Sequence, residues 1–169
     1  MNFKVGFGYD VHRLEKGCHL TVGGLTIPFE KGSVGHSDAD VLIHAIMDAL
    51  LGAAGLRDIG YHFPDTDNKY KGADSKELLR QTLVLLKQKG FVVGNIDATV
   101  SLQKPRIADY IPEMRQILSE IIQIPVEDIS VKATTTEKLG FVGEGKGIAA
   151  QAVVLIYKSR RTGFLKFFN

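Results

Sequence analysis

The chain has 169 residues, 44% of them hydrophobic and 24% charged, which suits one compact domain or two very small ones. No apolar run approaches the ~20 residues that cross a bilayer, no secretory signal is expected in the first ten residues, and the single cysteine, Cys18, excludes an intrachain disulfide and fits a reducing compartment. The net charge is +2, but four of the 21 basic residues lie in the last twelve, and the other 17 are fewer than the 19 acidic residues, so a basic stripe for nucleic acid is absent.

Two β elements are predicted before residue 31. Residues 4–12, KVGFGYDVH, place β-branched residues between glycines, a pattern typical of a strand. Residues 18–30, CHLTVGGLTIPFE, contain two apolar runs separated by Gly23 and Gly24, which predicts a hairpin that turns at these glycines.

A helix that is apolar almost all round is predicted over residues 35–52. Ser37 is the expected N-cap, and Asp40 stands three residues later as in a capping box. Gly52 or Gly55 is expected to end the helix.

The rest of the chain predicts further alternation of helices and strands. The predicted strand at 95–103 alternates apolar and polar residues, as expected when only one face is buried. The elements are a loop at 56–72, a helix at 73–90 capped by Asp74 or Ser75, the strand at 95–103, a helix from Pro112, and strands at 128–136 and 147–158. This order predicts one α/β domain, a sheet covered by helices.

The helix at 35–52 carries three ionisable residues in one strip. Asp40, His44 and Asp48 lie within about 80° on the helix surface, and the other faces are apolar. Such a helix is normally buried in a core or a subunit interface. His44 is either a hydrogen-bonded core histidine or a ligand, whereas Asp40 either caps the helix or orients His44 from one turn away. Asp48 is a candidate for the same orienting role.

The segment GYDVHR adds two more candidate ligands. Asp10 and His12 stand two residues apart on a predicted strand, so their side chains point to the same face. With His44 from the helix they would form an Asp-His-His site with one open position, which is typical of catalytic zinc.

Five long segments are similar to one enzyme family. They resemble the 2-C-methyl-D-erythritol 2,4-cyclodiphosphate synthases of the non-mevalonate isoprenoid pathway, and the match runs in order from about Phe7 to Tyr157. The segments are GYDVHR, GHSDADVLIHAIMDALLGAAGLRDIG, HFPDTD, YKGADSKELLR and VKATTTEKLGF.

The resemblance implies a lyase and its architecture. The reaction would cyclise 4-diphosphocytidyl-2-C-methyl-D-erythritol 2-phosphate to 2-C-methyl-D-erythritol 2,4-cyclodiphosphate with release of CMP, by attack of the 2-phosphate on the metal-bound β-phosphate. The fold would be α/β (α+β), a single domain with a mixed β-sheet covered on one side by helices, packed as a homotrimer around a central axis with active sites between subunits. Residues 1–158 would form this domain, and the basic, aromatic tail 159–169 lies outside the shared pattern. The expected location is a bacterial cytoplasm, or the plastid stroma if a transit peptide has been removed.

The resemblance also implies two metals. Zn²⁺ or another divalent metal would bind Asp10, His12 and His44, and Mg²⁺ or Mn²⁺ would bind Glu137 together with the substrate. Attack of one phosphate on another builds negative charge, which a bound metal withdraws. The nucleophile is already an anionic phosphate, so no general base is required.

The remaining site residues are also implied by the match. His36 and Thr135 match catalytic positions that hold phosphates, and His36 and Ser37 are expected at a helix N-terminus, where free N–H groups favour anions. Asp58, Gly60 and residues 63–67 match the methylerythritol loop, while residues 102–108 and 133–135 match the cytidine pocket. The full expected substrate site is Asp10, His12, His36, Ser37, Asp58, Gly60, Phe63, Pro64, Asp65, Thr66, Asp67, Leu102, Gln103, Lys104, Pro105, Arg106, Ile107, Ala108, Ala133, Thr134, Thr135, Thr136, Glu137 and Phe141.

Some positions depart from the family pattern, and two other functions stay open. Arg106 replaces a common Lys, and Glu144 and Lys146 stand where Arg and Glu are usual, which puts in doubt an anion in a central trimer cavity. The competing interpretations are a phosphohydrolase, in which water attacks the diphosphate at the same metal, and a structural zinc or nucleotide-binding module.

Overall fold

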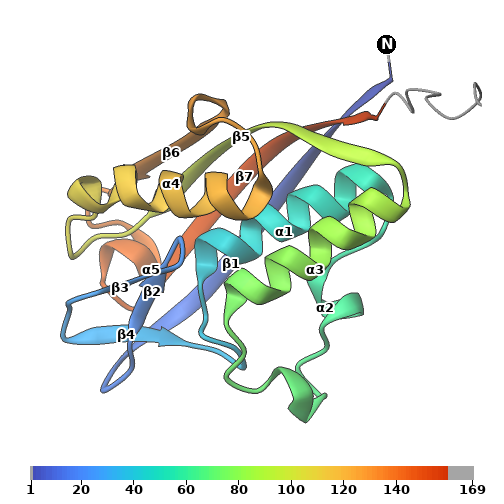
Figure 1. Cartoon of the computed structure of the whole chain (residues 1–169). Coiled ribbons are helices and arrows are strands. Elements are labelled where there is room, and N and C mark those ends of the chain that lie inside the picture. Colours follow the sequence, from blue (N-terminus) through green and yellow to red (C-terminus); the bar gives the residue numbers. More distant parts are fainter. Residues whose placement is uncertain (1, 160–169) are drawn as a thin grey trace, which may run out of the picture.

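The computed structural model describes residues 2–159 and shows a five-stranded sheet with helices packed against one face (Figure 1). The strands follow the spatial order β4-β1-β7-β5-β6, in which β5 and β6 are parallel and all other neighbours are antiparallel. Their bounds are Phe3–Lys16 for β1, Lys31–Val34 for β4, Phe91–Ser101 for β5, Ile129–Thr134 for β6 and Gly147–Lys158 for β7. The prediction of a single domain with a mixed sheet covered on one side by helices is therefore confirmed.

Three long helices cover the sheet, and a small hairpin lies beside them (Figure 1). The hairpin turns at Gly23 and Gly24, as predicted. The helices are α1 (Val41–Ala54), α3 (Ser75–Gln88) and α4 (Ile111–Ile122), and the hairpin pairs β2 (Leu20–Val22) with β3 (Leu25–Ile27). The shorter elements are α2 (Ile59–His62), α5 (Gly140–Gly143) and 3-10 turns at Asn68–Tyr70, Ala108–Tyr110 and Val126–Asp128. Within residues 2–159, none of the helices has the length and apolar character needed to span a membrane.

Helix α1 lies directly against strand β1 because two glycines leave no side chain between them. A Cβ on Gly6 would lie 1.9 Å from the backbone oxygen of Ala49, and one on Gly8 would lie 2.0 Å from that of Ala45. This close contact brings side chains of α1 within reach of the β1 residues that follow on the same face.

The prediction that Ser37 caps α1 is wrong, since the helix begins at Val41 with Asp40 as its N-cap. The Asp40 carboxylate accepts hydrogen bonds from the backbone N–H groups of Leu42 and Ile43. Gly55, with φ of 71°, ends the helix in a left-handed conformation, and Gly52 lies inside it.

Strand β5 begins four residues earlier than the alternating pattern predicts. Its register against β7 shifts between Val93 and Asn95, where Gly94 packs closely on Leu155. This bulge interrupts the alternation, so the pattern identifies only the part of the strand after it. From Ile96 onward the predicted alternation of buried and more exposed residues is confirmed.

The face of the sheet opposite the helices carries a row of exposed apolar side chains. The outward-facing residues of β1 are between 43% and 65% exposed, and Val153 and Tyr157 of β7 lie beside them in register with Phe7 and Phe3. An apolar face of this kind marks an interaction surface. The outward-facing residues of β1 are Phe3, Val5, Phe7, Tyr9 and Val11.

Candidate metal centre and substrate site

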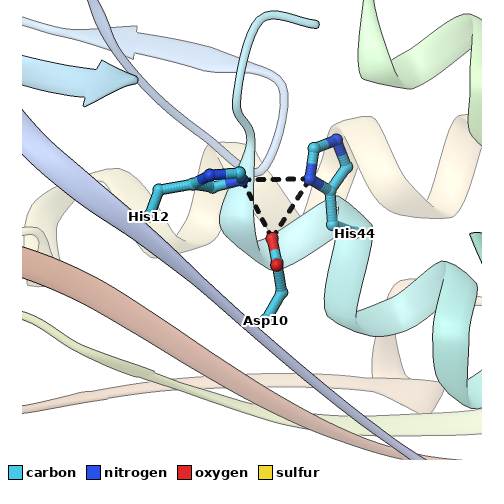
Figure 2. A group of neighbouring side chains, drawn as sticks. All are labelled: Asp10, His12 and His44. Carbon is cyan, nitrogen blue, oxygen red and sulfur yellow. Dashed lines mark hydrogen bonds and ion pairs between the residues drawn. The ribbon is translucent and has the colours of Figure 1, made fainter. Parts of the chain in front are cut away.

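Three potential metal ligands from β1 and α1 point toward one another in Figure 2. Asp10 Oδ2 lies 3.0 Å from His12 Nε2 and 3.1 Å from His44 Nδ1, and the two histidine nitrogens are 3.1 Å apart. Asp10 and His12 share the β1 face that packs on α1, as their spacing predicts, and His44 is the helix residue that faces them.

The donor set and its dimensions fit a divalent metal. Ligands about 2.0–2.1 Å from a tetrahedral metal are about 3.3 Å apart, close to the three observed distances. An aspartate with two histidines leaves a fourth position for a substrate oxygen, whereas a structural site would normally close with a fourth protein ligand. Within residues 2–159 this is the single group of three or more potential ligands with metal-binding spacing.

The pKa values of this cluster reflect strong mutual interaction. Burial raises the pKa of Asp10, but hydrogen bonds from His12 and His44 outweigh burial and hold this pKa well below its usual range. Burial lowers the pKa of His44, but the hydrogen bond and the charge of Asp10 outweigh it and raise this pKa. Asp10 is therefore an anion in the metal-free protein and attracts either a proton on His44 or a cation.

The second ring nitrogen of His44 has partners that the sequence analysis missed. His44 Nε2 lies 2.9 Å from Ser75 Oγ and 3.2 Å from Ser37 Oγ. The Ser75 hydroxyl in turn donates a short hydrogen bond to Asp38. The sequence marks Ser75 only as a candidate helix cap, and no local pattern connects it with His44, which lies 31 residues earlier.

Asp40 and Asp48 are engaged elsewhere. Besides capping α1, Asp40 accepts hydrogen bonds from the backbone N–H groups of Gly23 and Gly24, so of its two predicted roles the structure supports the cap. Asp48 accepts a hydrogen bond from the backbone N–H of Ile59 at 2.8 Å and thereby holds the start of α2.

One group of predicted substrate residues lies near the N-terminal part of α1, which carries His44. His36 Nε2 lies 3.1 Å from the backbone oxygen of Asp67, and its own backbone oxygen accepts from Gly72. Asp58 caps α2 through the N–H of Tyr61. The residues brought together here are His36, Ser37, Asp58, Gly60 and the loop 63–67.

The expectation that His36 and Ser37 use free N–H groups of a helix is wrong. The helix begins only at Val41, and the Asp40 carboxylate already occupies the N–H groups of Leu42 and Ile43. An anion held by His36 or Ser37 would therefore not be bound by the N–H groups of Leu42 and Ile43 in the first turn of α1.

A second group of predicted residues lies at the far edge of the sheet. The backbone N–H of Leu102 donates to Thr134, and that of Lys138 donates to the Gln103 side chain, which joins segments 102–108 and 133–138. In this group Thr135 Oγ1 donates to Glu137 Oε1 at 2.7 Å.

The two groups are well separated within one chain. Asp10 pairs with Ala150, Ala150 pairs with Val100, and Val100 pairs with Ala133, so Asp10 and Ala133 stand in one row three strands apart. At 4.7–4.9 Å per strand their backbones are about 14 Å apart. Glu137, in the loop that follows β6, does not belong to the triad cluster.

Phe141 and the pair Glu144 and Lys146 lie in or near α5 and make contacts within their own segment. Phe141, from α5, is 44% exposed and packs over Gly147 at the start of β7. Glu144 and Lys146 form an ion pair with each other in the same chain. Of the predicted tail 159–169, only residue 159 is among the described residues.

The fold and the triad together define an α+β domain with a three-residue candidate metal site. A model of the YgbB family matches residues 3–157, and the chain belongs to this family.

Named relatives and solved structures agree with this assignment. A relative from Bacteroides fragilis, named 2-C-methyl-D-erythritol 2,4-cyclodiphosphate synthase, is 58% identical over 156 residues, which cover 92% of this chain and 98% of the relative. The bifunctional IspDF of Campylobacter jejuni is 41% identical with a TM-score of 0.89, over 93% of this chain and 42% of that longer protein. A 2C-methyl-D-erythritol-2,4-cyclodiphosphate synthase in a CDP-bound form is 36% identical with a TM-score of 0.84, over 90% of this chain and 99% of that one.

Proposed function

We propose that this chain cyclises 4-diphosphocytidyl-2-C-methyl-D-erythritol 2-phosphate to 2-C-methyl-D-erythritol 2,4-cyclodiphosphate with release of CMP. The observation that carries the proposal is the convergence of Asp10, His12 and His44 in a chain whose 58% identical relative is named for this product. A bacterial cytoplasm is the proposed setting, because that relative is bacterial.

The triad would hold Zn²⁺ or another divalent metal through Asp10 Oδ2, His12 Nε2 and His44 Nδ1. When bound, the metal supplies Lewis-acid withdrawal of the negative charge that develops at the attacked phosphate. Asp10 adds a fixed negative charge that neutralises part of the cation, and the two histidines leave a net positive centre that attracts a diphosphate.

His36, Ser37 and Thr135 would hold phosphate oxygens through their side chains. Their work is positioning, because the reaction requires the 2-phosphate oxygen to approach the β-phosphorus in line with the departing CMP oxygen. No side chain has to remove a proton from the nucleophile, since the 2-phosphate is anionic at neutral pH.

Asp58, Gly60 and residues 63–67 would bind the methylerythritol part beside the metal. The segments 102–108 and 133–135 would bind cytidine, as supported by the CDP-bound form of the structural relative. Phe141 would lie beside these segments as part of the substrate site. Glu137 would hold Mg²⁺ or Mn²⁺ together with the substrate diphosphate, since hard cations bind through few protein carboxylates and many phosphate oxygens.

A homotrimer with active sites between subunits is the assembly that fits these two groups best. Asp10 and Ala133 of one chain stand about 14 Å apart by strand spacing, and Glu137, in the loop after the strand of Ala133, is not part of the triad cluster. Metals held by the triad and by Glu137 of the same chain would therefore not share one diphosphate. The uncovered apolar face of β1 and β7 supplies a surface on which copies of the chain would pack. The triad of one subunit would then face the proposed cytidine-binding segments, 102–108 and 133–135, of its neighbour.

Phosphorus NMR of the product tests the proposed reaction directly. Cyclisation forms a cyclic diphosphate and CMP, so CMP is the single monophosphate ester produced and no inorganic phosphate is released. Attack of water would instead give a linear phosphate product, and that result would favour a phosphohydrolase. Metal-stripped protein, tested with and without added Zn²⁺ and Mg²⁺, serves as the control.

A further inference from the structure

We propose that Asp38 and Ser75 are positioning residues that hold His44 in the one tautomer able to bind a metal. The inference rests on the metal centre of the proposed function, and it assigns a role to two residues outside the triad. Neither residue belongs to the substrate groups described above.

The direction of the hydrogen bonds follows from the chemistry of the three groups. An ionised Asp38 carboxylate only accepts hydrogen bonds, so the single proton of the Ser75 hydroxyl is donated to it. The Ser75 oxygen then faces His44 Nε2, 2.9 Å away, only with its lone pairs. His44 must therefore carry a proton on Nε2, and a neutral ring protonated there has its lone pair on Nδ1.

Nδ1 is the nitrogen that faces the other two ligands. It lies 3.1 Å from Asp10 Oδ2 and 3.1 Å from His12 Nε2. The chain of hydrogen bonds from Asp38 through Ser75 thus presents the lone pair of His44 to the centre of the triad. Partners of this kind also fix the plane of a ligand ring.

The surroundings of Ser75 support a dedicated role. Its side chain is fully buried, so water does not compete for the hydroxyl. Asp38 also accepts from the backbone N–H of Ser75 at 3.1 Å, which fixes the carboxylate on this residue. The N-cap of α3 is Asp74, whose carboxylate accepts from Lys76, so capping does not require the Ser75 side chain.

Ser37 offers a weaker alternative partner. Its oxygen is 3.2 Å from His44 Nε2 and also accepts from the N–H of Ala39. It has no carboxylate partner of its own that would fix the direction of its proton. Loss of Ser75 should therefore weaken the orientation of His44 without removing every hydrogen bond to it.

The test measures metal binding rather than activity. Zn²⁺ affinity of Ser75→Ala, determined by competition with a chromophoric chelator, should fall about 10- to 100-fold relative to wild type. The Co²⁺-substituted variant should also show a changed visible spectrum, because the ring of His44 is less well oriented. Ser75→Thr, which keeps the hydroxyl, should recover most of the affinity.

Asp74→Ala is the matched control for a structural effect at the same helix end. It removes the cap of α3 but no partner of His44, so it should lower the unfolding midpoint of the metal-free protein and leave Zn²⁺ affinity unchanged. Asp38→Asn provides a second variant should Ser75→Ala fail to fold, and its affinity should also fall, because an amide is a weaker acceptor that can turn its NH₂ group toward Ser75.

Two results would overturn this inference while leaving the metal centre standing. The first is wild-type Zn²⁺ affinity in Ser75→Ala, or in Asp38→Asn if Ser75→Ala does not fold. The second is an equal loss of Zn²⁺ affinity in that variant and in Asp74→Ala. A wild-type protein that binds no divalent metal at the triad would overturn the metal centre and this inference together.

Discussion

Asp40 accepts a hydrogen bond from the backbone N–H of Gly24 at 2.6 Å, sixteen residues earlier in the chain. The same carboxylate accepts from Gly23, Leu42 and Ile43, so one buried side chain fixes both the turn of the β2–β3 hairpin and the start of α1. Since His44 lies one turn into this helix, the position of a candidate metal ligand depends on a contact with a distant hairpin.

Replacing Asp40 should therefore cost more than the loss of an ordinary helix cap. Asp40→Ala leaves four backbone N–H groups without their acceptor, and we expect a loss of about 3 kcal/mol in the free energy of unfolding. Asp74→Ala, a cap without a hairpin contact, should cost about 1 kcal/mol. Urea denaturation of the metal-free proteins measures both, and equal losses would contradict the tethering role of Asp40.

His44→Ala should remove the metal while leaving the assembly intact. The variant keeps only Asp10 and His12, which is too few protein ligands for a tight site. Metal analysis after gel filtration should show less than one tenth of the wild-type zinc, at an unchanged molecular mass by light scattering. His19→Ala, an exposed histidine outside the site, is the control. Full zinc retention in His44→Ala would remove this residue from the centre.

Acidification should release the metal because protons compete for His44. Its raised pKa means that, in the metal-free protein, its ring takes up a proton above the ordinary value of 6.5. Metal affinity should therefore fall about tenfold per pH unit below that raised pKa. Competition titrations from pH 8.5 to 5.5 measure this trend, and a constant affinity over the range would be inconsistent with histidine ligation.

The metal-free protein should show the opposite dependence on pH. Because the pKa of His44 is raised in the folded protein, its protonation stabilises the fold when the pH is below the unfolded-state pKa. This contribution is lost as the pH rises through the raised folded-state pKa of His44. The lowered pKa of Asp10 keeps its carboxylate charged at every pH between 6 and 8. The increase in melting temperature caused by Zn²⁺ should thus grow between pH 6 and 8, and a gain that shrinks with pH would contradict the assignment.

Glu137→Gln separates the two proposed metals. An amide is a weaker, neutral donor to a hard cation, so turnover should fall by roughly 10²-fold and more Mg²⁺ should be needed. Zinc content should match wild type, because the triad is untouched. Glu127→Gln, another exposed glutamate, serves as the control. Normal turnover of Glu137→Gln at low Mg²⁺ would make Glu137 a plain surface charge.

A mixed assembly tests whether active sites lie between subunits. Assemblies of His44→Ala alone or of Glu137→Gln alone should have little activity. A shared site with an intact triad from one subunit and an intact Glu137 from the other should work. Random mixing on co-expression should restore about a quarter of the wild-type rate. Mixed trimers, purified through two different tags, that stay inactive would place both groups of a site in one subunit.

Local periodicity in the sequence was enough to predict the elements that carry the triad. Alternation places Asp10 and His12 on one face of a strand whatever surrounds it, and the apolar run around His44 predicts a buried helix. Alternation likewise predicts the buried face of β5 from Ile96 onward, since it depends only on neighbours in the chain. The hairpin at Gly23 and Gly24 follows from the conformations that only glycine adopts easily.

Only the tertiary structure decided which residues support these elements. Ser75 contacts both Asp38 and His44 because α3 packs against the start of α1, and no periodic pattern encodes that contact. The helix is capped by Asp40 rather than Ser37, and the hairpin glycines share the Asp40 carboxylate. The separation of the triad from the segments 102–108 and 133–138 follows from strand order, which is set by the packing of residues far apart in sequence and not by any local preference.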